Sequence, residues 1–434
     1  MQSLPIPRRF RKRQNSGWGY YLVSISANEL AREILDACLN EGTWPARTLD
    51  ALVERALDED DSFRAVAATR ALFAVLIERL ADLFEPSLCD LYAQLFSYVI
   101  SRALPEYDPA ELLLRYHRIR QVRRFPGGEV RRVFVLSRVT LGADVAVTSV
   151  VLAAAKKRFP EAEIHLLGPA KNAELFAADP NVVPVAVTYD RGSLLRDRLS
   201  AAAELQIAVD EPAAIVIDPD SRLTQLGLIP ICEDTRYFFF ESRAFGGELD
   251  GTLPALTSEW LTEVFDVDPT EPYVAPALQE KVANVTVSLG VGDNLNKRLD
   301  DEFEYEVLSA LLKRGRPILI DRGAGGDEAA RVDALVERLG SHKLLHVHHG
   351  SYASFASHIA QSDLYVGYDS AGQHVAAAAH VPLVSIFSGY ACERMLARWR
   401  PSGPKAHLIV VNEENRPTAL DRTLQAIAVA AEGA

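Results

Sequence analysis

The residues best suited to chemistry lie in segment 367–374, which reads Gly-Tyr-Asp-Ser-Ala-Gly-Gln-His. The apolar run before it predicts a buried strand, and the Ala-rich run after it predicts a helix that begins close to Gly372. The N-terminus of a helix presents unpaired N–H groups and the positive end of the dipole, so it can hold a diphosphate. Asp369 or Ser370 suits the cap, Asp369 also suits a sugar or ribose hydroxyl, and His374 suits a phosphate or a sugar. An ordinary capped turn with a core histidine is the alternative.

A second candidate segment follows another predicted strand, at residues 288–303. Gly290 and Gly292 come directly after the apolar run, and Lys297 and Arg298 come before the next predicted helix. Cations at this position could neutralise the charge that develops on a departing nucleotide diphosphate. Surface cations before a helix would have the same pattern.

Asp144 is the candidate general base. It follows the first strand of an α/β pattern, in the segment SRVTLGADVAVTS, and a carboxylate can take the proton from an attacking hydroxyl. The alternative role is that of a helix N-cap, because an apolar helix follows Asp144 directly.

Two weaker patterns complete the set. Gly323, Gly325 and Gly326 follow a predicted strand, and together with Gly290 they suit a wall beside a nucleotide base or ribose. Four histidines raise the possibility of a metal site, but they lack acidic or cysteine partners in a known spacing, so no metal site is expected. They are His342, His346, His348 and His349. A Walker-type phosphate loop is absent from the sequence.

The elements that position these residues alternate between strand and helix in two series. One series spans residues 130–270 and the other 280–415, with a Pro-containing stretch between them and a helix expected at 416–434. The pattern is less regular between about 200 and 265, and the order of elements there stays open. The prediction is an α/β fold with two Rossmann-like lobes and a cleft between them, in which ligands sit beyond the carboxyl ends of the strands.

Residues 1–125 predict a different kind of domain. Apolar residues recur at helical spacing from residue 27 onward, Ser26 or Asn28 suits the first cap, and Pro86 and Pro109 mark later helix boundaries. We therefore expect an all-α accessory domain with a basic N-terminal tail. Nothing in it resembles a catalytic pattern.

Composition limits the classes of partner. The formal charge of −13 argues against a general nucleic-acid binder. Two basic clusters interrupt the acidity and suit either solvated surfaces or an anionic acceptor or membrane surface. One comprises Arg8, Arg9, Arg11, Lys12 and Arg13, and the other Arg115, Arg118, Arg120, Arg123 and Arg124, with Arg131 and Arg132 just beyond.

The expected location is the cytoplasm, with possible peripheral contact with the inner membrane. The four cysteines are widely spaced, which is typical of neither a zinc site nor a disulfide framework. No apolar stretch approaches the length of a membrane span, and no signal peptide is evident.

The three main segments, in this order, resemble the ADP-heptose:lipopolysaccharide heptosyltransferases, inverting glycosyltransferases of GT-B architecture. The first-lobe match is SRVTLGADVAVTSVVLAAAKKRFPEAEIHLLG, the second is SLGVGDNLNKR, and the third is GYDSAGQHVAAAAHVPLVSIFSG. The resemblance covers about residues 130–415, so the helical N-terminal region lies outside it.

The resemblance implies a reaction and roles. Asp144 corresponds to the general base, Lys297 to the cation near the donor, and the 369–374 loop to the donor phosphate and sugar contacts. It implies a metal-independent inverting displacement, with a nucleotide-sugar as substrate, no separate cofactor, and a glycan, lipid or protein acceptor.

This sequence departs from the family pattern at three places. Ala143 stands as an extra residue between Gly142 and Asp144, and Ala371 replaces a glycine after Asp-Ser. Phe387-Ser388-Gly389-Tyr390 stands where the family has Gly-Pro-Thr. Two alternatives to a transferase therefore stay open: a catalytically silent nucleotide-sugar-binding or scaffold protein, and a sugar-nucleotide epimerase of the same architecture.

Overall fold

A computed structural model describes residues 25–247, 251–292, 294–323, 325–340 and 342–432. The chain forms two compact units, of which one holds residues up to Leu80 with residues 192–195, and the other holds residues 81–191 and 196–434. The basic cluster at residues 8–13 lies outside the described residues. No helix among those described is long and apolar enough to cross a membrane.

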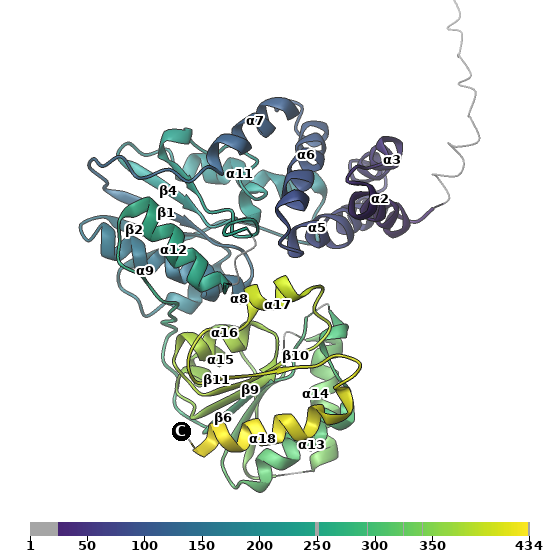
Figure 1. Ribbon diagram of the computed structural model, residues 1–434, viewed down its shortest axis with the longest axis vertical. Helices are drawn as coiled ribbons and strands as arrows, with labels where there is room; N and C mark the ends of the chain where they lie inside the picture. The colour runs from purple at the N-terminus through teal and green to yellow at the C-terminus, as the bar shows by residue number, and fades with distance from the viewer. Residues whose placement is uncertain (1–24, 248–250, 293, 324, 341, 433–434) are drawn as a thin grey trace, which may run out of the picture. The chain divides into compact units, whose positions relative to one another are not determined.

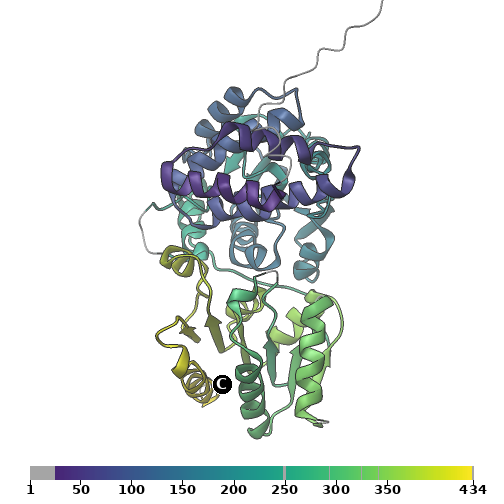
Figure 2. The same cartoon turned by 90° about the vertical axis from the view of Figure 1, so that its right-hand side faces the viewer.

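The first unit is helical, as expected, and its helices are the purple elements of Figure 2. Ser26 caps the first helix in a capping box, because its hydroxyl accepts from the Glu29 amide while the Glu29 carboxylate accepts from the Ser26 amide. A π-helical stretch continues directly from the third helix. The elements are α2 (Ala27–Glu41), α3 (Ala46–Ala56), α4 (Ser62–Arg70) and η1 (Ala71–Ile77), and α5 (Glu78–Asp82) leads into the second unit.

The first lobe of the second unit is a five-stranded parallel sheet in the order β3-β2-β1-β4-β5 (Figure 1). Its strands are β1 (Arg132–Leu136), β2 (Glu163–Gly168), β3 (Val182–Ala186), β4 (Ala214–Asp218) and β5 (Tyr237–Phe239). Its helices are α8 (Leu141–Ala143), η2 (Asp144–Thr148), α9 (Ser149–Arg158), α10 (Ala170–Ala173), η3 (Glu174–Phe176), α11 (Leu195–Ala208), η4 (Arg222–Thr224), η5 (Asp234–Arg236) and α12 (Leu253–Phe265).

The second lobe is a six-stranded parallel sheet in the order β11-β10-β9-β6-β7-β8. Its strands are β6 (Val285–Ser288), β7 (Ile318–Asp321), β8 (Leu345–His348), β9 (Leu364–Tyr368), β10 (Leu383–Phe387) and β11 (Ala406–Val410). Its helices are η6 (Leu295–Lys297), α13 (Asp301–Lys313), α14 (Gly326–Leu339), α15 (Tyr352–Ala360), α16 (Ala371–Ala378), α17 (Glu393–Trp399), η7 (Arg416–Thr418) and α18 (Ala419–Glu432). The expected pair of Rossmann-like lobes is confirmed.

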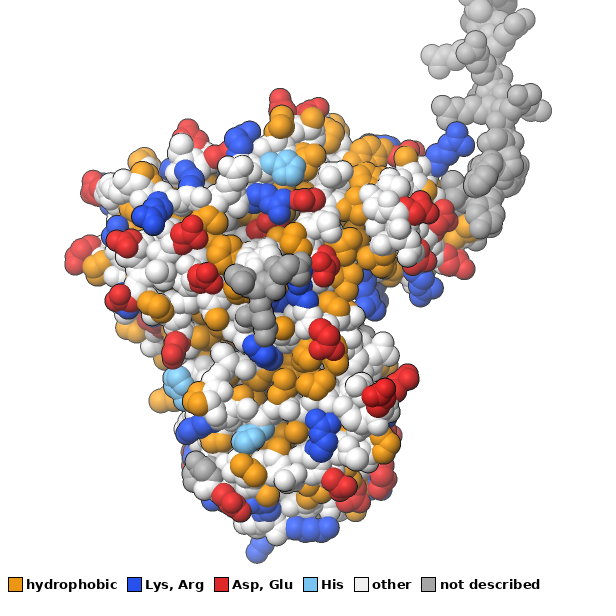
Figure 3. Space-filling model, viewed as in Figure 1, with side chains coloured by type: hydrophobic (Ala, Val, Ile, Leu, Met, Phe, Trp, Pro, Cys, Tyr) orange, Lys and Arg blue, Asp and Glu red, His pale blue; other side chains and the backbone are white. Residues whose placement is uncertain are grey.

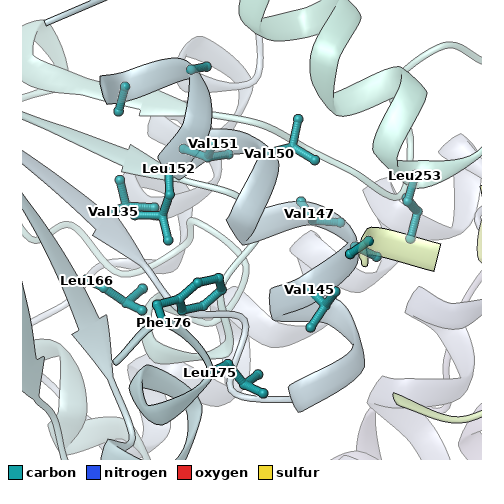
Figure 4. Close-up of a cluster of buried hydrophobic side chains, with 14 of the residues drawn as sticks. Val135, Val145, Val147, Val150, Val151, Leu152, Leu166, Leu175, Phe176 and Leu253 are labelled. Carbon is teal, nitrogen blue, oxygen red and sulfur yellow. The ribbon is translucent and has the colours of Figure 1, made fainter. Parts of the chain in front are cut away.

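Apolar side chains alternate between the two faces of the second sheet. Val366 of β9 belongs to the core beneath α13, α14 and α18, whereas Tyr365 belongs to the core beneath α15 and α16. That second core continues into the first lobe, where Leu152 of α9 lies beside Val135 of β1, and Val147 of η2 lies on the opposite side of the helix, toward Leu253 of α12 (Figure 4). The two lobes therefore share one apolar cluster.

Two helices of the predicted accessory domain belong to the second unit. These are α6 (Pro86–Ala103) and α7 (Pro109–Ile119). The Tyr92 hydroxyl donates to the Gln225 carbonyl at 3.2 Å, and the Tyr116 hydroxyl donates to the Glu241 carboxylate. The two helices thus pack on the loops that flank β5, and the described helices of residues 1–125 divide between the two units.

The second basic cluster contacts the protein itself. Arg115 and Arg120 are largely enclosed, so the predicted solvated surface is wrong for them, whereas Arg118 and Arg123 are exposed as that prediction expects. Arg115 and Arg118 both pair with Asp234, at 2.8 and 3.0 Å. Arg120 pairs with Asp90 and Glu241, and Arg123 donates to backbone carbonyls of residues 234, 235 and 237. These arginines attach α7 to the first lobe. On the face drawn in Figure 3, acidic and basic side chains are interspersed.

Arg115 and Arg118 provide a matched test of this attachment, because they share one partner but differ in burial. The Arg115 side chain is 8% exposed and also donates to the Gly227 carbonyl, whereas the Arg118 side chain is 63% exposed. We expect Arg115→Met to lower the free energy of unfolding by about 2 kcal/mol, because it leaves the buried Gly227 carbonyl without its donor and removes the closer of the two pairs with Asp234. Arg118→Met should cost about 0.5 kcal/mol or less. Denaturant unfolding measures both, and equal losses would contradict the attachment through buried pairs.

Candidate active site

The central contact of the second lobe joins Lys297 to Asp369. The lysine Nζ lies 2.6 Å from the Asp369 Oδ2 and 3.3 Å from the Asp369 backbone oxygen. Lys297 ends η6, in the loop after β6, and Asp369 follows β9. Chain order reverses between these neighbouring strands, and ligands of open parallel sheets sit beyond such a reversal. The structure therefore brings together two of the predicted donor-site residues.

Gln373 holds Asp369 from the other side. Its amide nitrogen donates to the Asp369 Oδ1 at 2.6 Å, and its amide oxygen accepts from the hydroxyl of Ser385 on β10. Both Asp369 oxygens thus have protein donors, and the side chain is 7% exposed. The carboxylate is fixed in place, as a group that must orient a ligand needs to be.

His374 is buried at the start of α16. Burial lowers the pKa of its imidazole to about 4; the negative charge of Asp369 opposes this change, and the positive charge of Lys297 adds to it. The ring packs edge-on against Trp399, with a centroid separation of 5.6 Å. At neutral pH His374 therefore offers a ligand a hydrogen bond and no positive charge.

The glycines of this loop leave room for the side chain of Tyr365. A β-carbon on Gly372 would overlap the Tyr365 hydroxyl, and one on Gly367 would lie 2.5 Å from the same oxygen. The Tyr365 side chain belongs to the core beneath α15 and α16. Its hydroxyl lies against the backbone at Gly372, so the close approach that this glycine permits is that of the Tyr365 side chain. Ser370 occupies the N-cap position, but its side chain makes no capping hydrogen bond, and neither side chain expected to cap α16 does so.

Arg298 forms its ion pairs with the start of α13. Its guanidinium pairs with Glu304 at 2.6 Å and with Asp301, both on α13. Glu304 also accepts from the Tyr368 hydroxyl at 3.1 Å, so this network fixes the start of α13 to β9. The donor-binding role of Arg298 stays a prediction, and its contacts are those of a structural residue.

A carboxylate lies beside two of the glycines that were predicted to line the nucleotide. A β-carbon on Gly290 would overlap the Glu328 carboxylate, and one on Gly323 would lie 2.5 Å from it. Gly325 has φ +113° at the start of α14, with no atom within 4 Å of the β-carbon position among the described residues. Gly290 and Gly323 therefore converge on Glu328 beyond β6 and β7, where a nucleotide was expected.

Asp144 is fully buried within the first lobe. Its Oδ1 accepts from the Arg138 amide and the Thr148 hydroxyl, both at 2.6 Å. Its Oδ2 accepts from the Ser137 hydroxyl at 2.6 Å and the Asn172 amide at 2.5 Å. Burial raises the pKa of the carboxyl, and the four hydrogen bonds oppose that rise. The general-base role stays a prediction, while these surroundings are those of an anchor for the loop after β1.

The lobes meet where this loop reaches α16. A β-carbon on Gly142 would lie 3.2 Å from the Ala371 Cα and 3.3 Å from the His374 ring. A second contact is made by α17, whose Arg394 donates to the Phe84 carbonyl at 2.9 Å, while the Phe84 and Trp399 rings pack edge-on. α17 begins just beyond Phe387-Ser388-Gly389-Tyr390, the segment that departs from the family pattern.

Sequence reasoning missed several residues of this site. Gln373 lies inside the quoted loop, four residues after Asp369, and that helical spacing was the signal that could have found it. Glu328 and Trp399 come from other elements, and no local pattern links them to the loop.

The histidine group does not gather around one point. His348 lies 3.4 Å from the Asp321 carboxylate and 3.3 Å from the Ser354 hydroxyl. Within the described segments, no group of three or more histidine, cysteine or acidic residues is placed to hold a metal ion.

Comparison with known proteins locates the similarity mainly in the second lobe. Residues 281–425 match the family model of glycosyltransferase family 9 (heptosyltransferase). No curated protein sequence matches the chain significantly.

Solved structures extend the similarity to both lobes. A family 9 glycosyl transferase from Veillonella parvula has a TM-score of 0.53 at 15% identity, over 71% of this chain and 99% of its own. The Escherichia coli heptosyltransferase WaaC with ADP has 0.52 at 14%, over 69% and 99%. The E. coli ADP-heptose lps heptosyltransferase II has 0.50 at 16%, over 70% and 99%. At these identities the comparison shows the fold, and the GT-B-like architecture is confirmed.

The buried His374 predicts a pH-dependent stability. Because the folded protein holds the pKa of His374 at about 4, below about 6.5 in an unfolded chain, protonation favours unfolding. The stabilising contribution is complete above pH 6.5 and is lost as the pH falls toward 4. His374→Gln should therefore lose about 3 kcal/mol less than the wild type between pH 7 and pH 4. His346→Gln, at an exposed position, should follow the wild type, and a His374→Gln curve parallel to the wild type would contradict the assignment.

Proposed function

We propose that this chain, in which residues 281–425 match glycosyltransferase family 9, transfers a sugar from a nucleoside diphosphate to an acceptor hydroxyl. The observation that carries the proposal is the pairing of Lys297 with Asp369 at the start of α16, at the strand-order reversal of the second sheet. It combines a cation, a fixed carboxylate and a helix N-terminus, which together suit a diphosphate linked to a sugar.

In this proposal the phosphates lie against the amide groups that begin α16, and Lys297 neutralises the charge that grows as the nucleoside diphosphate leaves. Asp369 accepts a hydrogen bond from a sugar or ribose hydroxyl, because a carboxylate would repel a phosphate. Neutral His374 supplies a further hydrogen bond. These groups stabilise the leaving group electrostatically, in the role that a metal ion would otherwise have. The acceptor oxygen forms its bond to the anomeric carbon as the bond to the diphosphate breaks, and this single displacement inverts the configuration. Heptose is the sugar that the family match favours.

The acceptor hydroxyl approaches from the first lobe and must give up a proton. Asp144 serves as base in this scheme only where the hydroxyl replaces one of its four donors. Those same four hydrogen bonds favour a second candidate function, a nucleotide-sugar-binding protein without transfer activity. The two candidates share the donor site and differ at Asp144.

Lys297 and its neighbour Arg298 form a matched pair for testing the donor site. Lys297→Met should weaken ADP binding about 10- to 100-fold, because it removes the charged contact with the phosphates. Arg298→Met should leave ADP affinity within about twofold, because that guanidinium pairs with α13. Calorimetric titration of ADP measures both. Equal weakening by the two substitutions would contradict the assignment of Lys297 as the specific contact.

Asp144→Asn separates transfer from binding. If Asp144 is the general base, this substitution should lower the turnover number about 10²- to 10⁴-fold and leave the ADP affinity unchanged. If Asp144 only anchors the loop after β1, the variant with the isosteric amide should keep most of the turnover and should have a lower melting temperature. Release of ADP from ADP-heptose, with a glycan acceptor panel, gives the rate. ADP binding without turnover in the wild type would establish the silent binding protein instead.

A further inference from the structure

The hydroxyl of Tyr365 is buried beneath the 367–374 loop. The residue is 0% exposed, and its Oη has no hydrogen-bond partner in the part of the chain that the structure describes. A β-carbon on Gly367 would lie 2.5 Å from this oxygen, and one on Gly372 would overlap it. Two positions without side chains therefore make room for a polar group under the first turn of α16. A buried hydroxyl without a partner is costly, so its presence here requires an explanation.

The neighbour of this hydroxyl within the loop is Ser370. Burial raises the pKa of Tyr365, and the nearby side chains of Ser370 and Ser288 oppose that rise. The Ser370 Oγ is itself buried, and among the described residues it has no hydrogen-bond partner either. The Ser370 hydroxyl is therefore turned inward, to the side of the loop on which Tyr365 lies.

Ser370 stands at the position from which a serine normally caps a helix. An N-cap hydroxyl usually accepts a hydrogen bond from an amide of the first turn. Ser26 does so at α2, and Ser351 does so at α15. At α16 the Ser370 side chain makes no such bond, although its backbone is extended, with φ −152° and ψ −178°. The inward hydroxyl thus replaces a cap that the backbone would allow.

Asp369, the other residue suited to cap α16, is also held away from its amides. Lys297 and Gln373 both donate to the Asp369 carboxylate. The first amides of a helix have no acceptor within the helix itself. With both possible caps turned elsewhere, these amides of α16 stay available to an anion, as the proposed function requires.

We propose that Tyr365 is a positioning residue, which holds the Ser370 hydroxyl inward and so keeps the first amides of α16 free for the donor diphosphate. This inference rests on the proposed function, because it concerns the same amides. A serine that capped the helix would compete with a phosphate oxygen for these donors. Tyr365 does not touch the ligand, and it acts through Ser370.

The test is Tyr365→Phe in the full-length protein, which keeps the ring and removes only the hydroxyl. Ser370 is then released to cap α16, so the ADP affinity should fall about 3- to 20-fold. The melting temperature without nucleotide should rise by about 1 to 3 °C, because the helix gains a cap and the core loses an unpaired hydroxyl. Calorimetric titration of ADP and thermal unfolding measure the two effects.

Tyr352→Phe is the matched control. It removes another buried tyrosine hydroxyl that lacks a partner among the described residues, but from α15. The ADP affinity of this variant should stay within about twofold of the wild-type value.

A second substitution separates this positioning role from a structural one. Ser370→Ala in the Tyr365→Phe background removes the competing hydroxyl, so the ADP affinity should return to within about twofold of the wild-type value. Damage to the loop would not be repaired by this change. Equal ADP affinity of the wild type and Tyr365→Phe would overturn the inference. So would a double variant that binds ADP no better than Tyr365→Phe.

The proposed function and the role of Tyr365 can fail separately. ADP binding that Lys297→Met weakens and Tyr365→Phe leaves unchanged would overturn only the role of Tyr365. Absence of ADP binding by the wild type would overturn the proposed function, and the role of Tyr365 with it.

Discussion

Each of the two sheets reverses its strand order once, and the rest of the site depends on that constraint. In a parallel sheet with right-handed crossovers, every strand delivers its following loop to the same edge. Where the order reverses, the two adjacent loops turn away from each other and leave backbone N–H groups and side chains accessible between them. The second sheet places Lys297 and Asp369 at its reversal, and the first sheet places Arg138 and Arg222 at its own. Residues that are far apart in the sequence therefore lie close together at the carboxyl edge of each sheet.

Burial then decides what those residues can do. The low pKa of His374 follows mainly from desolvation, so it is a neutral group beside a lysine. Asp144 keeps its position because four donors offset its desolvation. Arg243 of the first lobe keeps its charge beside Asp220, 2.6 Å away. Desolvation thus leaves a neutral imidazole, a hydrogen-bonded carboxyl and a paired guanidinium, according to which partners the fold supplies.

The strands, the two lobes and the 367–374 loop could be predicted from the sequence, because apolar runs and turn residues are local signals. The role of Gly372 could not, since it depends on the Tyr365 ring passing under the turn. The arginines of α7 looked like a surface feature because Asp234 and Glu241 lie more than a hundred residues away in the chain. The four donors to Asp144 were equally hidden, since Asn172 comes from a different element. Local pattern predicts the elements, and only the assembled lobes give each polar side chain its partner.

The contact of Gly142 with Ala371 sets a minimum spacing between the two loops that would carry the reactants. With no side chain on one partner and a single methyl group on the other, the backbones of α8 and α16 approach about as closely as two chain segments can. Reaction between two bound molecules depends steeply on their separation. A side chain at residue 142 would meet the Ala371 backbone first, so the two loops lie this close because Gly142 has none.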